Sequence, residues 1–113
     1  MARFERLIVW QKAQDFAIAV DIATRRMRAD AASQLRRSAA SIPDNIAEGS
    51  ERGSAPQFAH FLAIANGSCA EAQCQLRRAY ACGHIDREAF LDLIDAAQQI
   101  GWMLGALRRR WAA

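Results

Sequence analysis

Residues 54–82 read SAPQFAHFLAIANGSCAEAQCQLRRAYAC, and this stretch decides the fold class. Its apolar residues recur at alternating steps of four and three over three heptads, the pattern of a helix packed at a shallow angle against other helices. They are Phe58, Leu62, Ala65, Cys69, Ala72, Leu76 and Ala79. Ser54 followed by Pro56 indicates the start of the helix, and Gly83 indicates its end. The stretch therefore predicts one long helix that ends near Cys82.

Helical periodicity continues before this stretch. Between residues 7 and 28 the recurring apolar residues are Trp10, Ala13, Ala17, Val20 and Met27, with Phe16 and Ala23 beside them. Between residues 31 and 48 one apolar stripe consists of Leu35, Ala39, Ile42 and Ile46. Gly49 follows that stripe and is expected to form a left-handed C-terminal cap. The first half of the chain therefore predicts two further helices.

Pro43 lies inside the second of these helices. Proline cannot donate the hydrogen bond that the Ala39 carbonyl would accept in a regular helix. We therefore expect either a kink or a division of the helix at Ile42. Asn45 or Ser41 is expected to help satisfy the loosened turn.

A fourth helix is predicted from about Arg87 to Trp111, with Asp86 as its cap. One apolar stripe consists of Phe90, Ile94, Ala97, Gly101 and Leu104, and a second consists of Leu93, Ala96, Ile100, Met103 and Leu107. The second stripe either widens the contact with the core or faces another subunit. Short connections between long helices make consecutive helices antiparallel, so we expect an all-α, up-down-up-down four-helix bundle in a single domain of residues 1–113.

Composition restricts the classes of protein to which the chain can belong. The chain has 113 residues, 52% of them hydrophobic, with no run long enough to span a membrane. Cys69, Cys74 and Cys82 are odd in number and lack CxxC spacing, so we expect reduced thiols, with neither a disulfide framework nor a zinc site. No motif indicates a cofactor or a catalytic centre. These features favour a cytoplasmic protein that is not an enzyme.

Basic residues give the chain a formal charge of +3, and fourteen of the fifteen are Arg. In the expected bundle, one end, formed by the first and third connections, collects eight arginines against four acidic residues, and the middle of the bundle is acidic. The candidate contacts for RNA or DNA at that end are Arg25, Arg26, Arg28, Arg36, Arg77 and Arg78. The alternative interpretation is that these arginines are solvated helix ends that complement the helix dipoles.

Polar residues form a stripe on each of the two middle helices. One consists of Ser38, Ser41, Asn45 and Glu48, and the other consists of Ser68, Glu71, Gln75 and Arg78. Antiparallel packing of these helices predicts that Arg37 pairs with Glu71 and that Glu48 lies near His60. An unpaired buried arginine would be costly, so we interpret these residues, with Asn45, as structural polar pairs and not as a catalytic group.

Trp102 lies about 100° away from the core stripe of the last helix, in line with polar residues. A Trp exposed on a polar stripe would leave a large apolar surface in water, whereas aromatic side chains are common in subunit interfaces. We therefore expect Trp102 in the interface of a homo-oligomer. The alternative is that the last helix is rotated and Trp102 packs against the first helix.

Three segments carry a family resemblance. They are FERLIVWQKA at residues 4–13, QLRRSA at residues 34–39 and SIPDNIAEG at residues 41–49, followed by Phe58, Phe61-Leu62, Ile64-Ala65, Gly67-Ser68 and Glu71. In this order they resemble the four-helix-bundle proteins encoded in intervening sequences of bacterial 23S ribosomal RNA. The accessory protein of diversity-generating retroelements is similar. One departure is the short link between the first two helices, residues 27–33, where the family commonly has a longer segment.

The resemblance implies a left-handed bundle, a homopentamer and no established enzymatic activity. Together with the arginines, it leads to the hypothesis of an oligomeric accessory protein that binds RNA through its Arg-rich ends. The alternative is a structural or adaptor oligomer whose partner is another protein.

Overall fold

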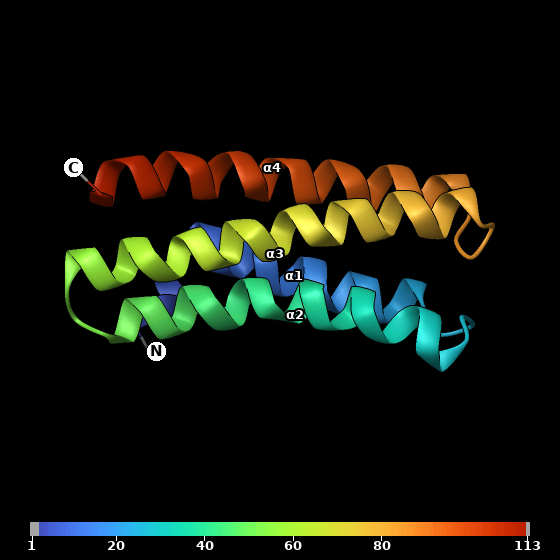
Figure 1. Cartoon of the computed structure of the whole chain (residues 1–113), viewed down its shortest axis with the longest axis horizontal. Helices are drawn as coiled ribbons and strands as arrows, with labels where there is room; N and C mark the ends of the chain where they lie inside the picture. The colour runs from blue at the N-terminus through green and yellow to red at the C-terminus, as the bar shows by residue number, and fades with distance from the viewer. Residues whose placement is uncertain (1–2, 113) are drawn as a thin grey trace.

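Four long helices follow one another along the chain. A computed structural model describes residues 3–112. A short 3-10 helix, η1 (Arg3–Arg6), precedes α1 (Ile8–Ala23), α2 (Ala29–Glu51), α3 (Ala55–Ala81) and α4 (Arg87–Ala112). Consecutive helices run antiparallel, with the α2–α3 connection at one end and the other two connections at the opposite end (Figure 1). The predicted all-α four-helix bundle is confirmed.

The caps predicted for α3 and α4 are present. Ser54 Oγ accepts a hydrogen bond from the Gln57 backbone N–H at 3.3 Å, which satisfies a free donor of the first turn of α3. Gly83 follows α3 with φ +78°, a conformation that glycine adopts without strain. The Asp86 carboxylate accepts from the Ala89 N–H at 2.8 Å and caps α4.

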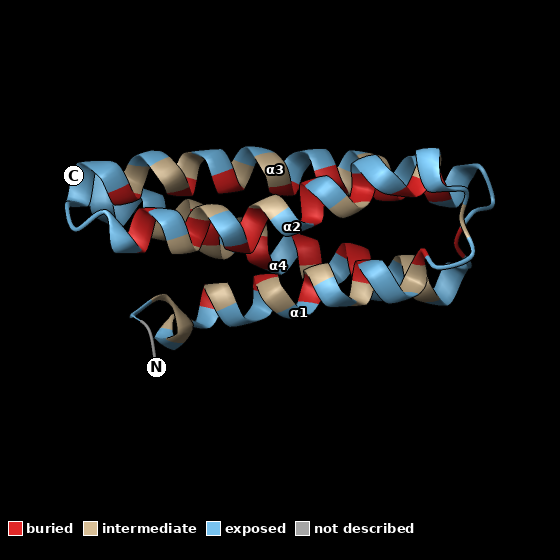
Figure 2. Cartoon of the chain, turned by 90° about the horizontal axis from the view of Figure 1, so that it is seen from below, coloured by how far each residue is buried: buried red, intermediate tan, exposed pale blue. Residues whose placement is uncertain are grey.

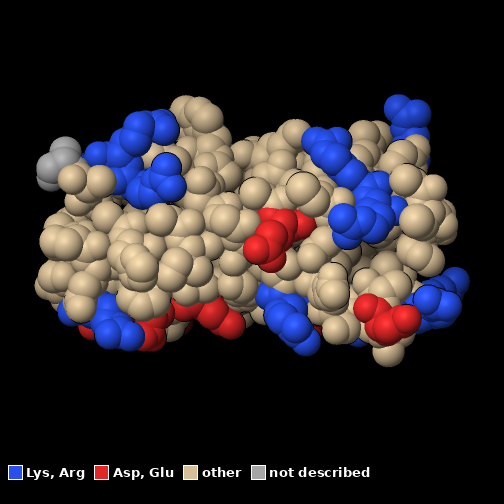
Figure 3. All heavy atoms as spheres, viewed as in Figure 1, with Lys and Arg blue, Asp and Glu red and all other residues tan. Residues whose placement is uncertain are grey.

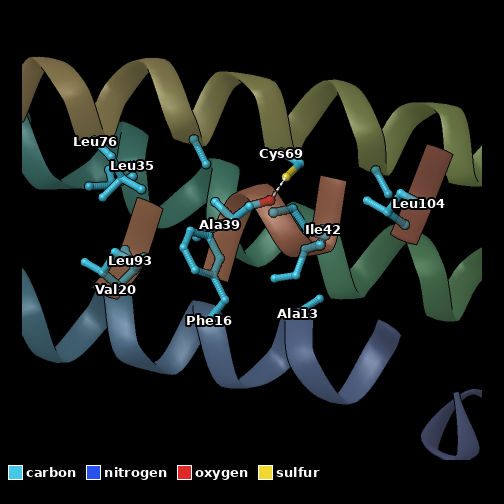
Figure 4. Packing of buried hydrophobic residues seen from close by; sticks show 14 of the residues in the cluster. Ala13, Phe16, Val20, Leu35, Ala39, Ile42, Cys69, Leu76, Leu93 and Leu104 are labelled. Atoms are coloured by element: carbon cyan, nitrogen blue, oxygen red, sulfur yellow. Dashed lines mark hydrogen bonds between the residues drawn. The ribbon is translucent and has the colours of Figure 1, made fainter. Parts of the chain in front are cut away.

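The core is one continuous cluster along the axis of the bundle. All seven apolar residues that predicted α3 are buried, and buried residues lie on the inward faces of the helices (Figure 2). Phe16 of α1 points into the space where side chains of the other helices meet (Figure 4). In α4 both predicted stripes contribute, since Ile94 and Leu104 of one and Leu93 and Ile100 of the other are buried. The second stripe therefore widens the core contact.

α1 is shorter than predicted. It ends at Ala23 and not near Arg28, and Val9 is buried while Trp10 is only half-buried. The Thr24 hydroxyl donates to the Val20 carbonyl at 2.8 Å, in addition to the Thr24 backbone N–H, which donates to the same carbonyl at 3.0 Å. The reversal of direction between α1 and α2 takes up residues that the periodicity had placed in a helix.

α2 is longer than predicted and continuous through Pro43, so of the two expected outcomes, a kink or a division at Ile42, the division is wrong. The Asn45 side chain donates to the Ser41 carbonyl at 2.8 Å, close to the turn that Pro43 loosens, and not to the Ala39 carbonyl. The predicted cap at Gly49 is also wrong, because the helix continues to Glu51 and the positive φ, +83°, occurs at Gly53.

A close contact between α2 and α3, and not a helix cap, explains why residue 49 is a glycine. A Cβ built at this position would lie 2.6 Å from Phe61 Cβ and 3.2 Å from Phe58 Cδ1. The absence of a side chain therefore lets α2 and α3 approach closely at this end of the bundle.

A membrane span requires a helix that is both long and predominantly apolar. Within residues 3–112, none of the helices combines the length and the apolar character needed to cross a bilayer.

Candidate nucleic-acid interface

The α1–α2 and α3–α4 connections bring four exposed arginines to one end of the bundle, which we call the basic end: Arg25, Arg26, Arg77 and Arg78. Within residues 3–112, none of these four side chains forms a hydrogen bond or an ion pair. On the face drawn in Figure 3, basic side chains gather toward both ends of the molecule and an acidic group lies between them. The arrangement offers free guanidinium groups to a polyanion.

Two arginines predicted for this interface have partners inside the chain. Arg36 donates from Nε to the Thr24 hydroxyl at 2.8 Å and from a terminal nitrogen to the Thr24 carbonyl at 2.9 Å. Asp21 lies 3.7 Å from the same guanidinium. Arg36 therefore caps the C-terminus of α1, where no glycine is available. Arg28 pairs with Asp30 at 3.3 Å, with both side chains largely exposed.

A polar seam runs along the contact between α2 and α3. It consists of Ser38, Ser41, Asn45, Ser68 and Glu71. The hydroxyls of Ser41 and Ser68 are 2.8 Å apart, and Asn45 donates to the Ser41 hydroxyl at 2.9 Å. Ser38 donates to a Glu71 carboxylate oxygen at 3.5 Å. The two polar stripes predicted from the sequence thus meet, and these contacts bind the helices to each other.

The two ion pairs predicted along this contact are wrong. Arg37 is exposed and makes no ion pair with Glu71, because the buried position beside Glu71 is taken by Ser38. Glu48 pairs with Arg52 one helical turn later, at 2.6 Å, and not with His60. The register of the helices is close to the predicted one, but it places neighbouring residues opposite each other.

An apolar surface lies on the α1 and α4 side of the bundle. Trp102 is 74% exposed, and Ile8, Ile18 and Ile22 on α1 are each more than half exposed. A groove between η1, α1 and α4 is lined by Ile8, Met103 and Trp102, and we call it the α1/α4 groove. The alternative in which Trp102 packs into the bundle is wrong for the single chain.

The cysteines differ in their surroundings. Cys69 is buried, and its thiol donates to the Ala97 carbonyl at 3.1 Å (Figure 4), whereas Cys74 and Cys82 are exposed. Burial raises the pKa of the Cys69 thiol, an effect that hydrogen bonds from Gln73 and the Gly101 backbone partly oppose. Within residues 3–112, no three His, Cys, Asp or Glu residues are grouped as metal ligands.

The family resemblance carried by residues 4–71 extends along most of the chain. The sequence model of the 23S rRNA-intervening sequence protein family matches residues 5–106. The chain belongs to this family. For this intervening-sequence protein the polar seam lies wholly within the matched region. A comparison with curated proteins gives no match.

A solved structure supports the fold of this intervening-sequence protein. It is a crystal structure of a protein with unknown function from the S23 ribosomal protein family of Bacteroides thetaiotaomicron, with a TM-score of 0.82 and 23% identity. The similarity covers 89% of this chain and 98% of the other. At this level of identity the comparison shows the shared fold alone.

Sequence reasoning missed two features of the site. Nothing in the periodicity distinguished Arg36 from its neighbours, although a Thr at the end of a helix without a glycine was a usable signal. The exposed isoleucines of α1 were also missed. That helix has only three charged residues, Lys12, Asp15 and Asp21, which is few for a helix with a face in water.

Proposed function

We propose that this protein is a homo-oligomer without enzymatic activity that associates with RNA through the basic end of each bundle. The observation that carries the proposal is the set of four exposed arginines that lack partners within residues 3–112. Arg36, by contrast, is held by Thr24 and is not free to bind a phosphate. The description of the family, which refers to 23S rRNA, supports RNA over DNA as the polyanion.

Binding of this kind follows from counterion release. Each guanidinium that neutralises a phosphate frees a condensed cation from the nucleic acid, so affinity falls steeply as salt concentration rises. Arg suits this contact better than Lys because its planar fork donates two parallel hydrogen bonds to a phosphate. Several basic ends in one assembly would contact one RNA together and increase its affinity through multivalency.

Assembly is proposed to use the α1 and α4 side. Trp102, Ile8 and Met103 line the α1/α4 groove, and a neighbouring subunit would remove this apolar surface from water. The number of subunits proposed is five, the number that the family resemblance implies. Light scattering coupled to size exclusion tests assembly: a mass well above 12.5 kDa at micromolar concentration supports it, and the monomer mass contradicts it.

The absence of catalysis is proposed from the chemistry of the polar seam. Ser41 contacts Ser68 and Asn45, and neither side chain can act as a general base for a serine nucleophile. The polar atoms of the seam instead bind α2 and α3 to each other. The free thiols fit a reducing compartment, and we propose the cytoplasm.

The direct test is binding of the full-length protein to a structured RNA over a salt series. We expect affinity to fall steeply as salt concentration rises. The slope of log affinity against log salt concentration should be about −3 or steeper. Failure to bind at low salt would contradict the RNA function and favour the alternative, an adaptor oligomer for a protein partner.

A further inference from the structure

A cleft opens between α2 and α3 at the basic end, where the polar seam is no longer closed by hydrogen bonds. Its volume is about 220 Å³, and Gln34, Gln75, Arg78 and His84 are among the residues that line it. One turn away, Ser38 and Glu71 are bonded across the same two helices. Moving one turn along each helix from that pair leads to Gln34 on α2 and Gln75 on α3, which therefore face each other across the cleft.

The side-chain oxygen of Gln75 is unusual in its surroundings. This atom is buried and has no hydrogen-bond partner, and it is the one such side-chain atom found within residues 3–112. Most buried polar atoms have a hydrogen-bond partner, so an unpaired one marks a place where a water or a bound molecule can supply it. Gln75 itself lines the cleft and is only half-buried, so a rotation of its side-chain amide would turn this oxygen toward a ligand there.

The walls of the cleft have the chemistry of a nucleotide site. The apolar lining consists of the half-buried Met27 and the buried Leu35 and Ala79, and the side-chain amides of the two glutamines supply donors and acceptors. An amide binds the edge of adenine with two hydrogen bonds, one donated and one accepted. Arg78 at the same cleft has no partner within residues 3–112 and suits a phosphate, while Asp30 at the rim is neutralised by Arg28.

We propose that this cleft binds the adenine base of a nucleotide, with Gln75 at the base edge and Arg78 at the phosphate. The inference rests on the proposed RNA function, in which the nucleotide is one unpaired adenosine of the RNA. It adds to that function a preference for a base, which arginines at the basic end do not supply. The same chemistry would also accept free adenosine monophosphate, and the experiment separates the two sources.

The first arm uses full-length protein labelled for NMR and needs no variant. Adenosine monophosphate should shift the side-chain amide resonances of Gln75 and Gln34, while uridine monophosphate at the same concentration should leave them in place. Absence of any shift with adenosine monophosphate contradicts the site.

The second arm compares a twelve-residue uridine RNA with the same RNA carrying one central adenosine. The adenosine should increase affinity about tenfold, the effect of one two-bond base contact. Gln75→Leu should abolish this gain, and Gln14→Leu, a matched change at a half-buried glutamine of α1, should preserve it. We expect Gln75→Leu to fold with an unchanged or higher Tm, because it removes an unsatisfied polar atom.

The outcomes distinguish this site from the proposed function. Equal affinity for both RNAs, together with no amide shift, contradicts the adenine site even when both RNAs bind with a steep salt dependence. Equal affinity with a clear shift supports an adenine site whose source is the free nucleotide. If neither RNA binds but the monophosphate still shifts Gln75, the RNA function fails and the cleft remains a nucleotide site.

Discussion

Gly49 of α2 and Gly67 of α3 predict opposite responses to the same substitution. Alanine is favoured over glycine in a helix by about 1 kcal/mol. At Gly67 a Cβ would meet nothing within 4 Å, so Gly67→Ala should stabilise the fold by about that amount. At Gly49 the new Cβ would lie 2.6 Å from Phe61 Cβ, an atom fixed to the backbone of α3 that cannot rotate away. Overpacking of this kind costs about 3 kcal/mol, which leaves Gly49→Ala destabilised by about 2 kcal/mol.

Thermal unfolding at one fixed protein concentration measures the contrast, because assembly would make Tm depend on concentration. For a chain of this length we expect Gly49→Ala to lower Tm by about 8 °C and Gly67→Ala to raise it by about 4 °C. If Gly49→Ala matches or exceeds the wild-type Tm, the close approach of α2 and α3 described above is wrong.

Further predictions concern Arg36, Trp102 and the cysteines. Arg36→Met should lower the free energy of unfolding by about 1–3 kcal/mol in urea titrations, because the cap on α1 is lost. The salt slope of RNA binding should stay as in wild type, and a reduced slope would show that Arg36 contacts RNA. Trp102→Ala should reduce the assembled mass in light scattering, and an unchanged mass with a lowered Tm would contradict its place in the interface. In the native protein an alkylating reagent should label Cys74 and Cys82 much faster than Cys69, because burial and a raised pKa hold the Cys69 thiol protonated. Since the folded pKa of Cys69 is raised above the unfolded value of about 9, stability should fall as pH rises through and above that value, and Cys69→Ala should remove that part of the pH dependence; equal slopes in both proteins would contradict it.

The helices could be predicted from sequence where one physical signal dominates. In α3 a stripe of seven apolar residues, a serine cap and a following glycine all agree, and the structure confirms each. Gly49 was misinterpreted because a glycine near a helix end is usually a cap, whereas here a close contact between two helices requires it. Periodicity along one helix contains no information on how near a second helix lies.

The candidate site was predictable in outline and not in its pairings. Two polar stripes on adjacent helices implied that they meet, and Ser41 and Ser68 do so. A shift of one residue decides whether Arg37 or Ser38 faces Glu71, and such a shift depends on packing of the whole bundle. The capping role of Arg36 depends likewise on where α1 ends, which the sequence pattern placed five residues too late.

The most direct test of the RNA function compares salt slopes for two matched triple variants. The first replaces three unpaired arginines of the basic end with glutamine, namely Arg25, Arg26 and Arg77. It leaves Arg78 in the cleft unchanged. The second removes the same charge at the opposite end of the bundle, through Arg108, Arg109 and Arg110. With structured RNA, we predict that the first variant reduces the slope of log affinity against log salt concentration by about 2–3 relative to wild type. The second should reduce it by less than about 1. Identical slopes for the first variant and wild type would contradict the claim that the basic end binds RNA.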